Sequence, residues 1–396
     1  MAEDLQQIYH KALAAHEQED YERAVELYEQ ILVRFPDADL VLYNQGLALY
    51  QLNRFAEAAS VFARAAEIRD DDADTWFNLG LALKQDSRYP EACRAYERAL
   101  KLAPDDADIV FNLANCCREG GYPEQAAAYY DKLLNIEPEH VSGLNNFAYL
   151  CHLRGEHGRT EELYQRLLHL RPDHPGALHM LAALNGTADT TPANEYIQEL
   201  FDQYSDTFEQ SLVEKLEYRV PELLFDLVGR NDTGSSSYEN CVDLGCGTGL
   251  AGVMFRPLCN RLTGVDLSEK MVVVAASKEV YDTLVTADVV QFLLQGNTQY
   301  DLFIAADLLT YMADLEPLFQ AVSQKSLPDS QFVFSTEHGD DSGWQVRSTG
   351  RFAHHPDYVA EAIEKCSGKI VCKQEADLRR EGENWIRGDI YLAVFN

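Results

Sequence analysis

CVDLGCGTGLAG, residues 241–252, can be read in two ways. From Gly247 it spells G-T-G-L-A-G, which formally satisfies the G-x-G-x-x-G fingerprint of dinucleotide-binding loops. From Gly245 it spells G-C-G-T-G directly behind the apolar run that contains Asp243. Both readings predict a strand, a glycine loop and a helix, but they imply different ligands above the loop.

The position of the loop and the charge of Asp243 distinguish the two readings. A glycine loop that holds a cofactor follows its strand directly, so that the backbone can turn beneath the ligand. The strand is CVDL, so the first glycine of the loop is Gly245. A carboxylate here is unfavourable beside a pyrophosphate but favourable beside an ammonium and a sulfonium group. S-adenosyl-L-methionine carries both cations, and we predict it as the cofactor.

Short apolar runs alternate with helical stretches from this loop to the C-terminus. The alternation predicts an α/β, Rossmann-like domain with a seven-stranded, mostly parallel sheet and helices on both faces. The last two runs leave no room for a crossover helix, so we expect them to pair antiparallel. The predicted strands are CVDLG, RLTGVD, YDTLVTAD, DLFIAAD, QFVFSTE, KIVCKQE and IYLAVF.

Residues 200–396 resemble the class I methyltransferases, whose motifs occur here in order at the predicted strand ends. VDLGCGTG resembles their first motif, and GVDLSEKM, TAD and AADLLTY resemble the next three. The resemblance implies that Asp266 accepts hydrogen bonds from the ribose hydroxyls and that Asp288 meets the adenine amino group. The cofactor-binding residues predicted from these motifs are Asp243, Gly245, Cys246, Gly247, Gly249, Asp266, Leu267, Met271 and Asp288.

Candidate catalytic residues follow from the chemistry of methyl transfer, an in-line displacement in which the enzyme mainly positions the nucleophile. A base helps only when the nucleophile carries a proton. Polar residues at the carboxyl ends of the fourth and fifth strands are therefore the candidates, and His338 can act as a base near neutral pH. These candidates are Asp307, Tyr311, Glu337 and His338.

The segment GRFAHHPDYV, residues 350–359, lies in a long insert after the fifth predicted strand. Arg351 can pair with a substrate carboxylate in bidentate fashion, or it can anchor a core carboxylate. His354 can act as a ligand or a base. Two adjacent histidines without a matching acidic cluster do not predict a metal site, so we expect no metal.

The N-terminal half carries several residue series with one period of 34 residues. They are Pro36, Pro104, Pro138 and Pro172; Ala24, Ala58, Ala92 and Ala126; Tyr28, Phe62, Tyr96, Tyr130 and Tyr164; and Gly46, Gly80, Ala114, Ala148 and Ala182. WFNLG at 76–80 resembles the W-x-x-L-G of tetratricopeptide repeats (TPR). We predict an all-α TPR solenoid with a capping helix at 175–186. Its five repeats are expected at about 5–38, 39–72, 73–106, 107–140 and 141–174.

A further series, Asn44, Asn78, Asn112 and Asn146, also repeats every 34 residues. In tetratricopeptide proteins this position lies on the first helix of each repeat and faces the concave surface. The series resembles the asparagine ladder with which some such solenoids hold an extended peptide. An amide side chain can donate and accept, so it matches a peptide unit whatever its side chain. The alternative is that asparagine is simply common at this position.

The stretch GTADTTPAN, residues 186–194, breaks the period and contains turn residues. We therefore predict a solenoid over 1–186, a linker over 187–194 and a methyltransferase domain over 195–396. Aromatic and leucine residues follow at helical spacing, either as simple packing or as a lid whose Tyr204 and Phe208 approach the cofactor.

Composition limits the partners and the compartment. The chain has 396 residues and a net charge of −32, with the acidity in both halves, so nucleic acid is not expected as a partner. Its nine cysteines contain no C-x-x-C pair and predict reduced thiols. The N-terminus lacks an apolar signal, and no run is long enough to span a membrane, so we expect a cytoplasmic protein.

The whole chain looks like bacterial methyltransferases that are preceded by tetratricopeptide repeats. The residues that carry this resemblance include YRVPELL, VDLGCGTG, FSTEHG, GRFAHHPDYV and LRREGENWIRGDIY. We predict an S-adenosylmethionine-dependent methyltransferase whose solenoid presents a protein or peptide substrate. The alternatives are a small-molecule methyltransferase, of a quinone or another metabolite, and a scaffold that binds the cofactor without turnover.

Overall fold

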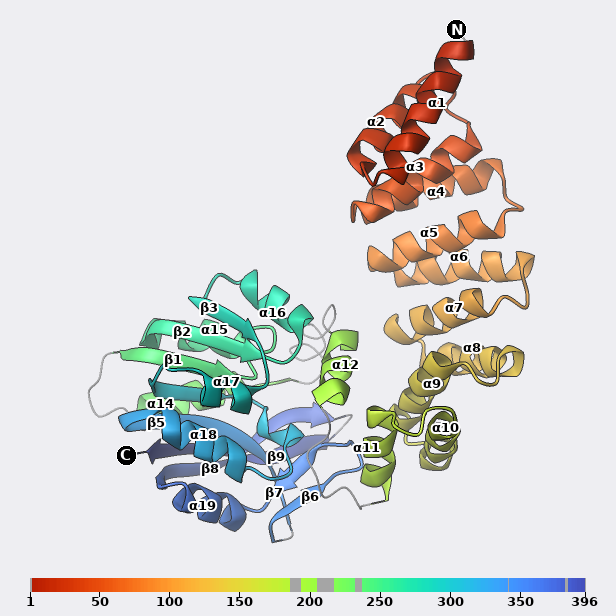
Figure 1. Cartoon of the computed structure of the whole chain (residues 1–396). Coiled ribbons are helices and arrows are strands. Elements are labelled where there is room, and N and C mark those ends of the chain that lie inside the picture. The colour runs from red at the N-terminus through yellow and green to blue at the C-terminus, as the bar shows by residue number, and fades with distance from the viewer. Residues whose placement is uncertain are drawn as a thin grey trace. The chain divides into compact units, whose positions relative to one another are not determined.

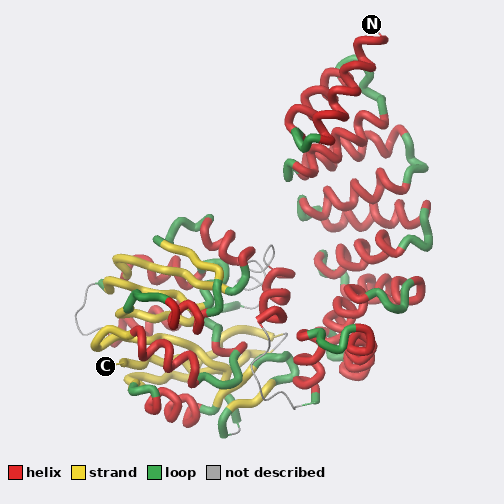
Figure 2. Tube along the Cα trace, in the orientation of Figure 1, coloured by secondary structure: helices red, strands yellow, loops and turns green. Residues whose placement is uncertain are grey.

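The computed structural model consists of two compact units, residues 1–172 and 173–396. It describes residues 2–185, 194–204, 217–231, 237–340, 342–381 and 384–395. The first unit is all helical, and the second is built on one twisted sheet (Figures 1 and 2).

The first unit contains five consecutive helix pairs, in agreement with the five predicted repeats. The pairs are α1 (Ala2–Glu17) with α2 (Tyr21–Leu32), α3 (Asp39–Gln51) with α4 (Phe55–Ile68), α5 (Ala73–Gln85) with α6 (Tyr89–Leu102), α7 (Ala107–Glu119) with α8 (Pro123–Ile136), and α9 (Val141–Leu153) with α10 (His157–Leu170). Each helix packs against the next along the chain, so the contacts are local, as in other solenoids.

Two of the periodic series meet in one contact in the second and third repeats. A Cβ atom at Gly46 would lie 2.6 Å from Cε1 of Phe62, and one at Gly80 would lie 2.7 Å from Cδ1 of Tyr96. Both rings are fully buried. The small residue of the first helix therefore makes room for the aromatic side chain of the second, and the two series share one period because they meet.

Helix starts repeat with the same period. The side chains of Asp72, Asp106, His140 and His174 accept hydrogen bonds from backbone N–H groups three residues later, at the starts of α5, α7, α9 and α11 (Pro175–Leu184). Such caps satisfy N–H groups that have no partner within the helix. By this local pattern α11 begins a sixth repeat.

The tertiary contacts of α11 do not continue the repeat pattern. The helix is grouped with the second unit, and its side chains contact residues of that unit. Nε2 of His179 lies 2.7 Å from the carbonyl oxygen of Gly350, and the Tyr196 hydroxyl lies 3.3 Å from Sδ of Met180. The predicted capping helix of the solenoid is therefore grouped with the sheet-containing unit, and the division falls before residue 186. The sequence could not reveal this, since caps are local and packing partners are distant.

All seven predicted strands are present in one sheet, and two short strands are added. The strands are β1 (Tyr238–Leu244), β2 (Cys259–Asp266), β3 (Thr283–Thr286), β4 (Tyr300–Ala305), β5 (Ser326–His338), β6 (Trp344–Val346), β7 (Phe352–His354), β8 (Gly368–Glu381) and β9 (Asn384–Phe395). Strands β3-β2-β1-β4-β5 run parallel, and β9 pairs antiparallel with β5 and β8, as predicted. The unpredicted β6 and β7 form a hairpin in the insert, where β7 pairs with the last two residues of β5.

Helices cover both faces of this sheet, because alternate strand residues are apolar on both sides. Along β4, Leu302 and Ile304 belong to one core cluster, and Phe303 and Ala305 belong to the other. The first cluster includes α14 (Val220–Asn231) and α15 (Leu250–Phe255); the second includes α17 (Val289–Gln295), α18 (Glu316–Lys325) and α19 (Pro356–Lys365). The unit also contains α12 (Asn194–Tyr204), α16 (Glu269–Ala276) and the 3-10 turns η2 (Arg256–Leu258) and η3 (Leu309–Tyr311).

The strand order determines where a ligand can enter. The chain moves outward from β1 to β2 and β3, and then returns to place β4 on the other side of β1. In open α/β sheets this reversal leaves a crevice at the carboxyl ends of the two central strands, where ligands bind.

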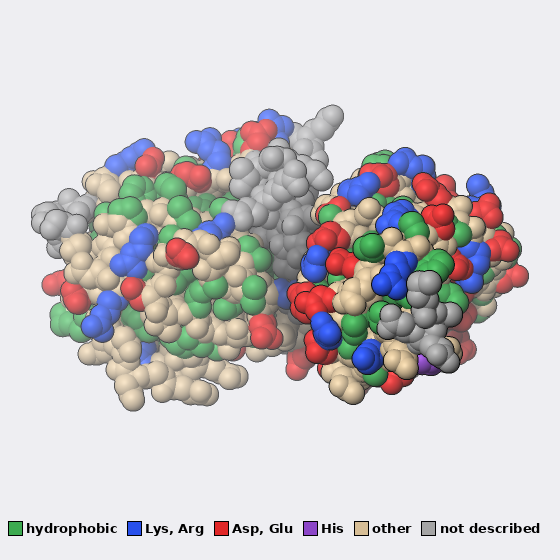
Figure 3. All heavy atoms as spheres, turned by 90° about the horizontal axis from the view of Figure 1, so that it is seen from above, with side chains coloured by type: hydrophobic (Ala, Val, Ile, Leu, Met, Phe, Trp, Pro, Cys, Tyr) green, Lys and Arg blue, Asp and Glu red, His purple; other side chains and the backbone are tan. Residues whose placement is uncertain are grey.

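Acidic and basic side chains are interspersed on the face of the repeats drawn in Figure 3. On that face the acidic residues therefore belong to a mixed surface rather than to a uniformly acidic one. None of the helices in the described part of the chain is both long and apolar enough to cross a membrane.

The packing of α11 predicts the effect of truncation. We expect a fragment of residues 173–396 to unfold at a higher temperature than residues 195–396, by at least about 2 kcal/mol in unfolding free energy, because the shorter fragment lacks the His179 hydrogen bond and the buried Met180. Thermal unfolding measures this difference, and Met180→Ala in the full chain is the matched point variant. Equal stability of the two fragments would mean that α11 contributes nothing to the second unit.

Candidate active site

A pocket lies at the expected crevice, and it is formed by residues of the second unit alone. It is bounded by the loops that follow β1, β2, β3 and β4, together with α12 and two arginines from the C-terminal part of the chain. The residues that line it include Asn194, Ile197, Phe201, Tyr218, Gly245, Cys246, Gly247, Thr248, Leu250, Asp266, Leu267, Asp288, Asp307, Leu308, Tyr311, Met312, Arg351 and Arg379.

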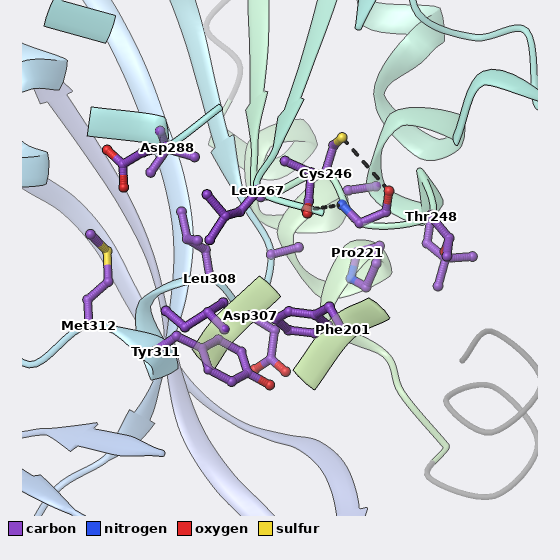
Figure 4. Close-up of a pocket in the computed structure, with 18 of the residues that line it drawn as sticks. Phe201, Pro221, Cys246, Thr248, Leu267, Asp288, Asp307, Leu308, Tyr311 and Met312 are labelled. Carbon is purple, nitrogen blue, oxygen red and sulfur yellow. Dashed lines mark hydrogen bonds between the residues drawn. The ribbon is translucent and has the colours of Figure 1, made fainter. Parts of the chain in front are cut away.

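Figure 4 shows how the labelled side chains are distributed. Asp288 and Met312 lie on one side of the pocket and Thr248 on the other, with Leu267 and Leu308 between them. Asp307 and Tyr311 lie at the same end, near Phe201. Asp288, which follows β3, therefore bounds one side of the pocket. Asp307 and Tyr311, which follow β4, bound one end of it.

The glycine loop adopts a backbone conformation that few other residues tolerate. Gly245, Gly247 and Gly249 have φ angles of 69°, 52° and 91°. A Cβ at Gly245 would lie 2.9 Å from Cδ1 of Leu308, whereas a Cβ at Gly247 would meet no atom within 4 Å. Gly247 lines the pocket, so a side chain there would extend into the space left for a ligand. This is the arrangement that close approach of a ligand to the backbone requires.

Asp266, at the end of β2, links the glycine loop that follows β1 to the turn that follows β2. Its Oδ2 accepts the backbone N–H of Gly247 at 2.8 Å, and its Oδ1 accepts that of Ser268 at 2.9 Å. The carboxylate is 8% exposed and borders the pocket. A carboxylate oxygen carries two lone pairs, so a side chain of this kind can accept a hydrogen bond from a diol in addition to one from a backbone N–H group.

Asp288 and Thr248 provide further polar groups. Asp288 caps α17 by accepting the N–H of Gln291 at 2.9 Å, and its other oxygen lies 3.4 Å from Nδ2 of Asn194. The hydroxyl of Thr248 is buried, and it has no hydrogen-bond partner among the described residues. A buried hydroxyl without a partner is costly, so a bound ligand is the natural source of its hydrogen bond.

Asp243 lies in an environment different from the one predicted for it. It is 0% exposed and does not line the pocket; its Oδ2 accepts the Tyr281 hydroxyl at 2.7 Å. Side chains alternate along a strand, so Asp243 shares the face of Cys241, which is covered by α14 and α15. Burial, with a contribution from Asp266, raises the pKa of Asp243 to about 7. The carboxyl therefore sits beneath the loop rather than beside a ligand.

Two other predicted cofactor residues also lie away from the pocket lining. Gly249 begins α15 as its left-handed N-cap, and Met271 is fully buried in α16. Their roles are to permit the turn and to fill the core. Tyr204 is the last residue of α12, and its side chain lies outside the described residues, as does Phe208. Six other residues that the motifs predict to bind the cofactor border the pocket: Gly245, Cys246, Gly247, Asp266, Leu267 and Asp288.

An ion cluster forms one end of the pocket. Nη1 of Arg379 donates to both carboxylate oxygens of Asp307, at 2.8 and 2.9 Å, and Nη2 donates to Glu337. Arg379 is 1% exposed. Asp307 has a left-handed backbone, with φ 61°, and its N–H donates to the Ser335 hydroxyl at 3.0 Å. Burial raises the pKa of Asp307, against the opposing attraction of Arg379 and Arg351.

Arg351 and Tyr311 lie at the same end. The guanidinium carbon of Arg351 is 6.0 Å from the centre of the Tyr311 ring, and the ring of Phe201 meets that of Tyr311 at 5.1 Å, edge to face. Both predicted residues, Arg351 and Tyr311, therefore border the pocket with Asp307.

His338 and Glu337 border a second cavity instead, which is lined also by Asp340, Arg347, Glu375, Asp377, Trp385 and Arg387. Nδ1 of His338 lies 2.7 Å from Oδ2 of the fully buried Asp389 on β9. Strand β5 continues beyond its pairing with β4 and pairs there with β9 and β7, so Glu337 and His338 lie past the end of β4. Neither residue is among those that line the first pocket.

His354 is a core residue. Its ring is fully buried, and Nε2 lies 2.9 Å from the carbonyl oxygen of Met312 and 3.2 Å from that of Ala313. Burial lowers the pKa of His354 to about 4. The imidazole therefore stays neutral and ties β7 to the loop after β4, in place of the predicted contact with substrate.

Several pocket residues carry no motif that could have revealed them. Arg379 lies more than seventy residues after its partner Asp307 in the chain, and only the pairing of β8 with β9 and of β9 with β5 brings them together. Phe201, Ile197 and Asn194 come from α12. The arginines in LRREGENW were visible in the sequence, but nothing there distinguished Arg379 from Arg380.

A known protein family matches part of each unit. A tetratricopeptide-repeat family matches residues 9–73 and 77–140, and a methyltransferase-domain family matches residues 242–334. Comparison with curated proteins gives no match to the chain.

Solved structures similar to the chain fall into two groups. The TPR protein YrrB, described as having an unusual peptide-binding site, is 21% identical over 43% of this chain and 89% of its own, with a TM-score of 0.40. Magnesium protoporphyrin IX methyltransferase from Synechocystis PCC 6803, with bound SAM, is 18% identical over 44% and 79%, with a TM-score of 0.35. The N-methyltransferase NodS from Bradyrhizobium japonicum WM9, with S-adenosyl-L-homocysteine, is 17% identical over 45% and 88%, with a TM-score of 0.38.

The fold, the glycine loop and the matched family define the second unit as a methyltransferase domain that uses S-adenosylmethionine. The open space above Gly247, the acceptor capacity of Asp266 and the unpartnered Thr248 hydroxyl fit that cofactor. The chain is therefore an S-adenosylmethionine-dependent methyltransferase that carries tetratricopeptide repeats ahead of its catalytic domain.

The role of Asp266 is open to direct measurement. We expect Asp266→Ala to weaken binding of S-adenosylhomocysteine by about 2–4 kcal/mol, because two ribose hydroxyls lose an acceptor and the loop loses its link to Gly247. Calorimetric titration of the full chain measures this, with the exposed Asp226→Ala on α14 as the control. NAD should bind neither protein; binding of NAD with similar strength would contradict the cofactor assignment.

The raised pKa of Asp243 predicts a pH dependence of stability. Its pKa rises from 3.8 to about 7 on folding, so a folded protein holds this proton when the unfolded chain has lost it. Relative to Asp243→Asn, the wild type should therefore lose unfolding free energy as pH rises from 3.8 to about 7, by about 1.4 kcal/mol per unit, and then level off.

Urea unfolding followed by Trp344 and Trp385 fluorescence, in a Trp76→Phe background, reports on the second unit. Tyr281→Phe removes the hydrogen bond to Asp243 and should extend the loss to higher pH. Parallel pH profiles for wild type and Asp243→Asn would contradict the shift.

Proposed function

We propose that the chain methylates a protein or peptide that its solenoid binds in an extended conformation. The observation that carries this proposal is the asparagine at the same position in four consecutive repeats: Asn44, Asn78, Asn112 and Asn146. All four lie on the first helix of their repeat and are only partly buried.

The hydrogen bonds of these asparagines indicate which of their side-chain atoms are already engaged within the solenoid. Nδ2 of Asn44 donates to the Tyr9 hydroxyl at 3.0 Å, and Nδ2 of Asn78 donates to the Tyr43 hydroxyl at 3.2 Å. Nδ2 of Asn112 donates to the carbonyl of Asp108 at 2.9 Å, four residues earlier. The amide nitrogens are thus anchored within the solenoid.

The amide oxygens are the groups left for a ligand. Among the described residues, no hydrogen bond is accepted by Oδ1 of any of the four ladder asparagines. An oxygen fixed in this way can accept a peptide N–H independently of the ligand's side chains. A row of such acceptors at the repeat spacing suits an extended segment better than a compact metabolite.

The second unit supplies the chemistry. When bound, S-adenosylmethionine supplies a methyl group made electrophilic by the sulfonium. Thr248, Asp266 and Asp288 orient the cofactor, while Phe201, Leu308 and Tyr311 exclude water from the end of the pocket where Asp307 lies. Asp307 is held by Arg379, so we assign it to positioning rather than to proton abstraction.

A small-molecule acceptor is the second candidate, and the lining of the pocket favours it. Ile197, Phe201, Leu250, Leu308 and Met312 give the pocket a largely apolar wall. Such a wall also suits an apolar metabolite, and the solenoid would then bind an unrelated partner. The intact glycine loop weighs against a third reading, in which the chain binds the cofactor without turnover.

The ladder is tested with the double variant Asn78→Ala, Asn112→Ala. Each lost acceptor should cost about 0.5–1.5 kcal/mol, so KM for a protein substrate should rise about tenfold or more, while kcat and S-adenosylhomocysteine affinity change little. The substrate is first found by mass spectrometry of proteins from a strain lacking the chain, as a missing methyl increment.

Asn135→Ala is the matched control, because Asn135 is exposed on the second helix of its repeat. Its kinetics should equal those of the wild type. Unaltered kinetics in the double variant would contradict the ladder. Equal activity of residues 173–396 alone on the protein substrate would contradict any contribution of the solenoid.

A further inference from the structure

We propose that the methyl acceptor is a carboxylate, which Arg351 holds at the end of the pocket beside Tyr311 and Asp307. The inference rests on the proposed function, because it concerns the acceptor in the same methyl transfer. It depends on three features of the pocket: a cation without an acidic partner, the absence of a free base among the described lining residues, and a rigid backbone that positions the cation.

The two arginines of the pocket differ in their partners. Arg379 is saturated by Asp307 and Glu337. By contrast, none of the ion pairs within 4.0 Å that join described residues includes Arg351. Its side chain lies beside Tyr311, with the guanidinium carbon 6.0 Å from the centre of the ring. A guanidinium that borders a pocket without a bidentate acid is suited to a carboxylate that enters from outside.

The backbone around Arg351 is held in place on both sides. The N–H of Arg347 donates to the carbonyl of Arg351 at 2.7 Å, and the N–H of Gly350 donates to the carbonyl of Arg347 at 2.9 Å. Gly350 has φ 80° and accepts the His179 hydrogen bond from α11. Arg351 then leads directly into β7, which pairs with β5. The cation is therefore presented from a fixed turn.

Burial disfavours the charge of Arg351, but the attraction of Tyr311, Glu337 and Asp307 outweighs it and raises the pKa. The guanidinium therefore carries its charge in the pocket. Asp307 and Glu337 are bonded to Arg379, so the donors of Arg351 that Tyr311 does not engage can bind a ligand.

The carboxylates among the described lining residues are already committed. Asp266 accepts two backbone N–H groups, Asp288 caps α17, and both oxygens of Asp307 accept from Arg379. No histidine or lysine is among the described residues that line this pocket. A protonated amine or an alcohol has to lose a proton in the reaction, and a base assists that loss, whereas a carboxylate has none to remove at neutral pH.

The step balances without a proton. One carboxylate oxygen contributes the electron pair of the new O–C bond, and the C–S bond breaks with its electrons remaining on sulfur. The products are a methyl ester and a neutral thioether. The other carboxylate oxygen stays on Arg351 during the transfer. Since the ester is uncharged, the ion pair with Arg351 is lost on methylation, which favours release of the product.

The chemical stability of the transferred methyl group tests this proposal. The full chain is incubated with S-adenosylmethionine tritiated on the methyl group and with a protein extract of its own cell, and labelled polypeptides are then treated with alkali. Methyl esters release volatile methanol, whereas methylated amines retain the label. We expect the label to become volatile. Base-stable label on polypeptides would overturn the carboxylate acceptor and leave the proposed function standing.

Label confined to small molecules would instead overturn the protein substrate. If that label were released by alkali, the acceptor would still be a carboxylate, so the two failures are distinguishable. Arg351→Gln should reduce transfer at least a hundredfold, and Arg351→Lys should retain part of it with a raised KM. The exposed Arg230→Gln on α14 is the matched control and should behave as the wild type.

A binding measurement is independent of turnover. With S-adenosylhomocysteine present, succinate should raise the melting temperature of the full chain more than succinamide does at equal ionic strength. Arg351→Gln should abolish this difference while S-adenosylhomocysteine affinity, which also reports correct folding, is unchanged. An equal response to succinate in wild type and Arg351→Gln would overturn the assignment of Arg351.

Discussion

The turn from β1 into α15 is the constraint on which the catalytic unit depends. Within five residues the backbone has to leave the strand, pass beneath a ligand and enter a helix, and three glycines with positive φ make this possible. The turn is tied to β2 twice: Gly245 and Cys246 donate to the carbonyl of Val265, and Gly247 donates to Asp266. The same bonds bring the acidic end of β2 to the pocket. The position of the loop thus sets the position of Asp266, which is predicted to meet the ribose.

The opposite end of the pocket depends on charge rather than on backbone shape. Arg379 neutralises Asp307 and Glu337 in a buried cluster, where any unpaired member would be costly. Because Arg379 pairs with both carboxylates, Arg351 is the cation among the described residues at that end that lacks an acidic partner, and Asp307 and Glu337 are held in ion pairs. Discrimination between acceptors then follows from which charges are already paired, and this is the physical basis of the proposed carboxylate specificity.

The periodic sequence of the repeats continues into α11, but the contacts of that helix do not follow the repeat. The small-residue and aromatic series share a period because their members meet within a repeat: Gly46 meets Phe62 in the second repeat, and Gly80 meets Tyr96 in the third. His174 continues the capping series into α11, yet the side chains of that helix bond to Gly350 and Tyr196 in the catalytic unit. The turn that carries Arg351 is therefore supported by a helix whose sequence follows the repeats.

The sequence by itself determined the repeats, the seven strands, the cofactor loop and the polar residues at the strand ends, because each of these is encoded in a short local pattern. Only the tertiary structure decided which of these residues meet. It turned Asp243 beneath the loop, buried His354 and directed His338 toward Asp389, because side chains alternate along strands and β5 extends beyond β4 to pair with β9 and β7. It also joined Arg379 to Asp307 across a large sequence separation. Such pairings arise from sheet order and register, which involve distant segments and leave no periodic or motif-length signal in the chain.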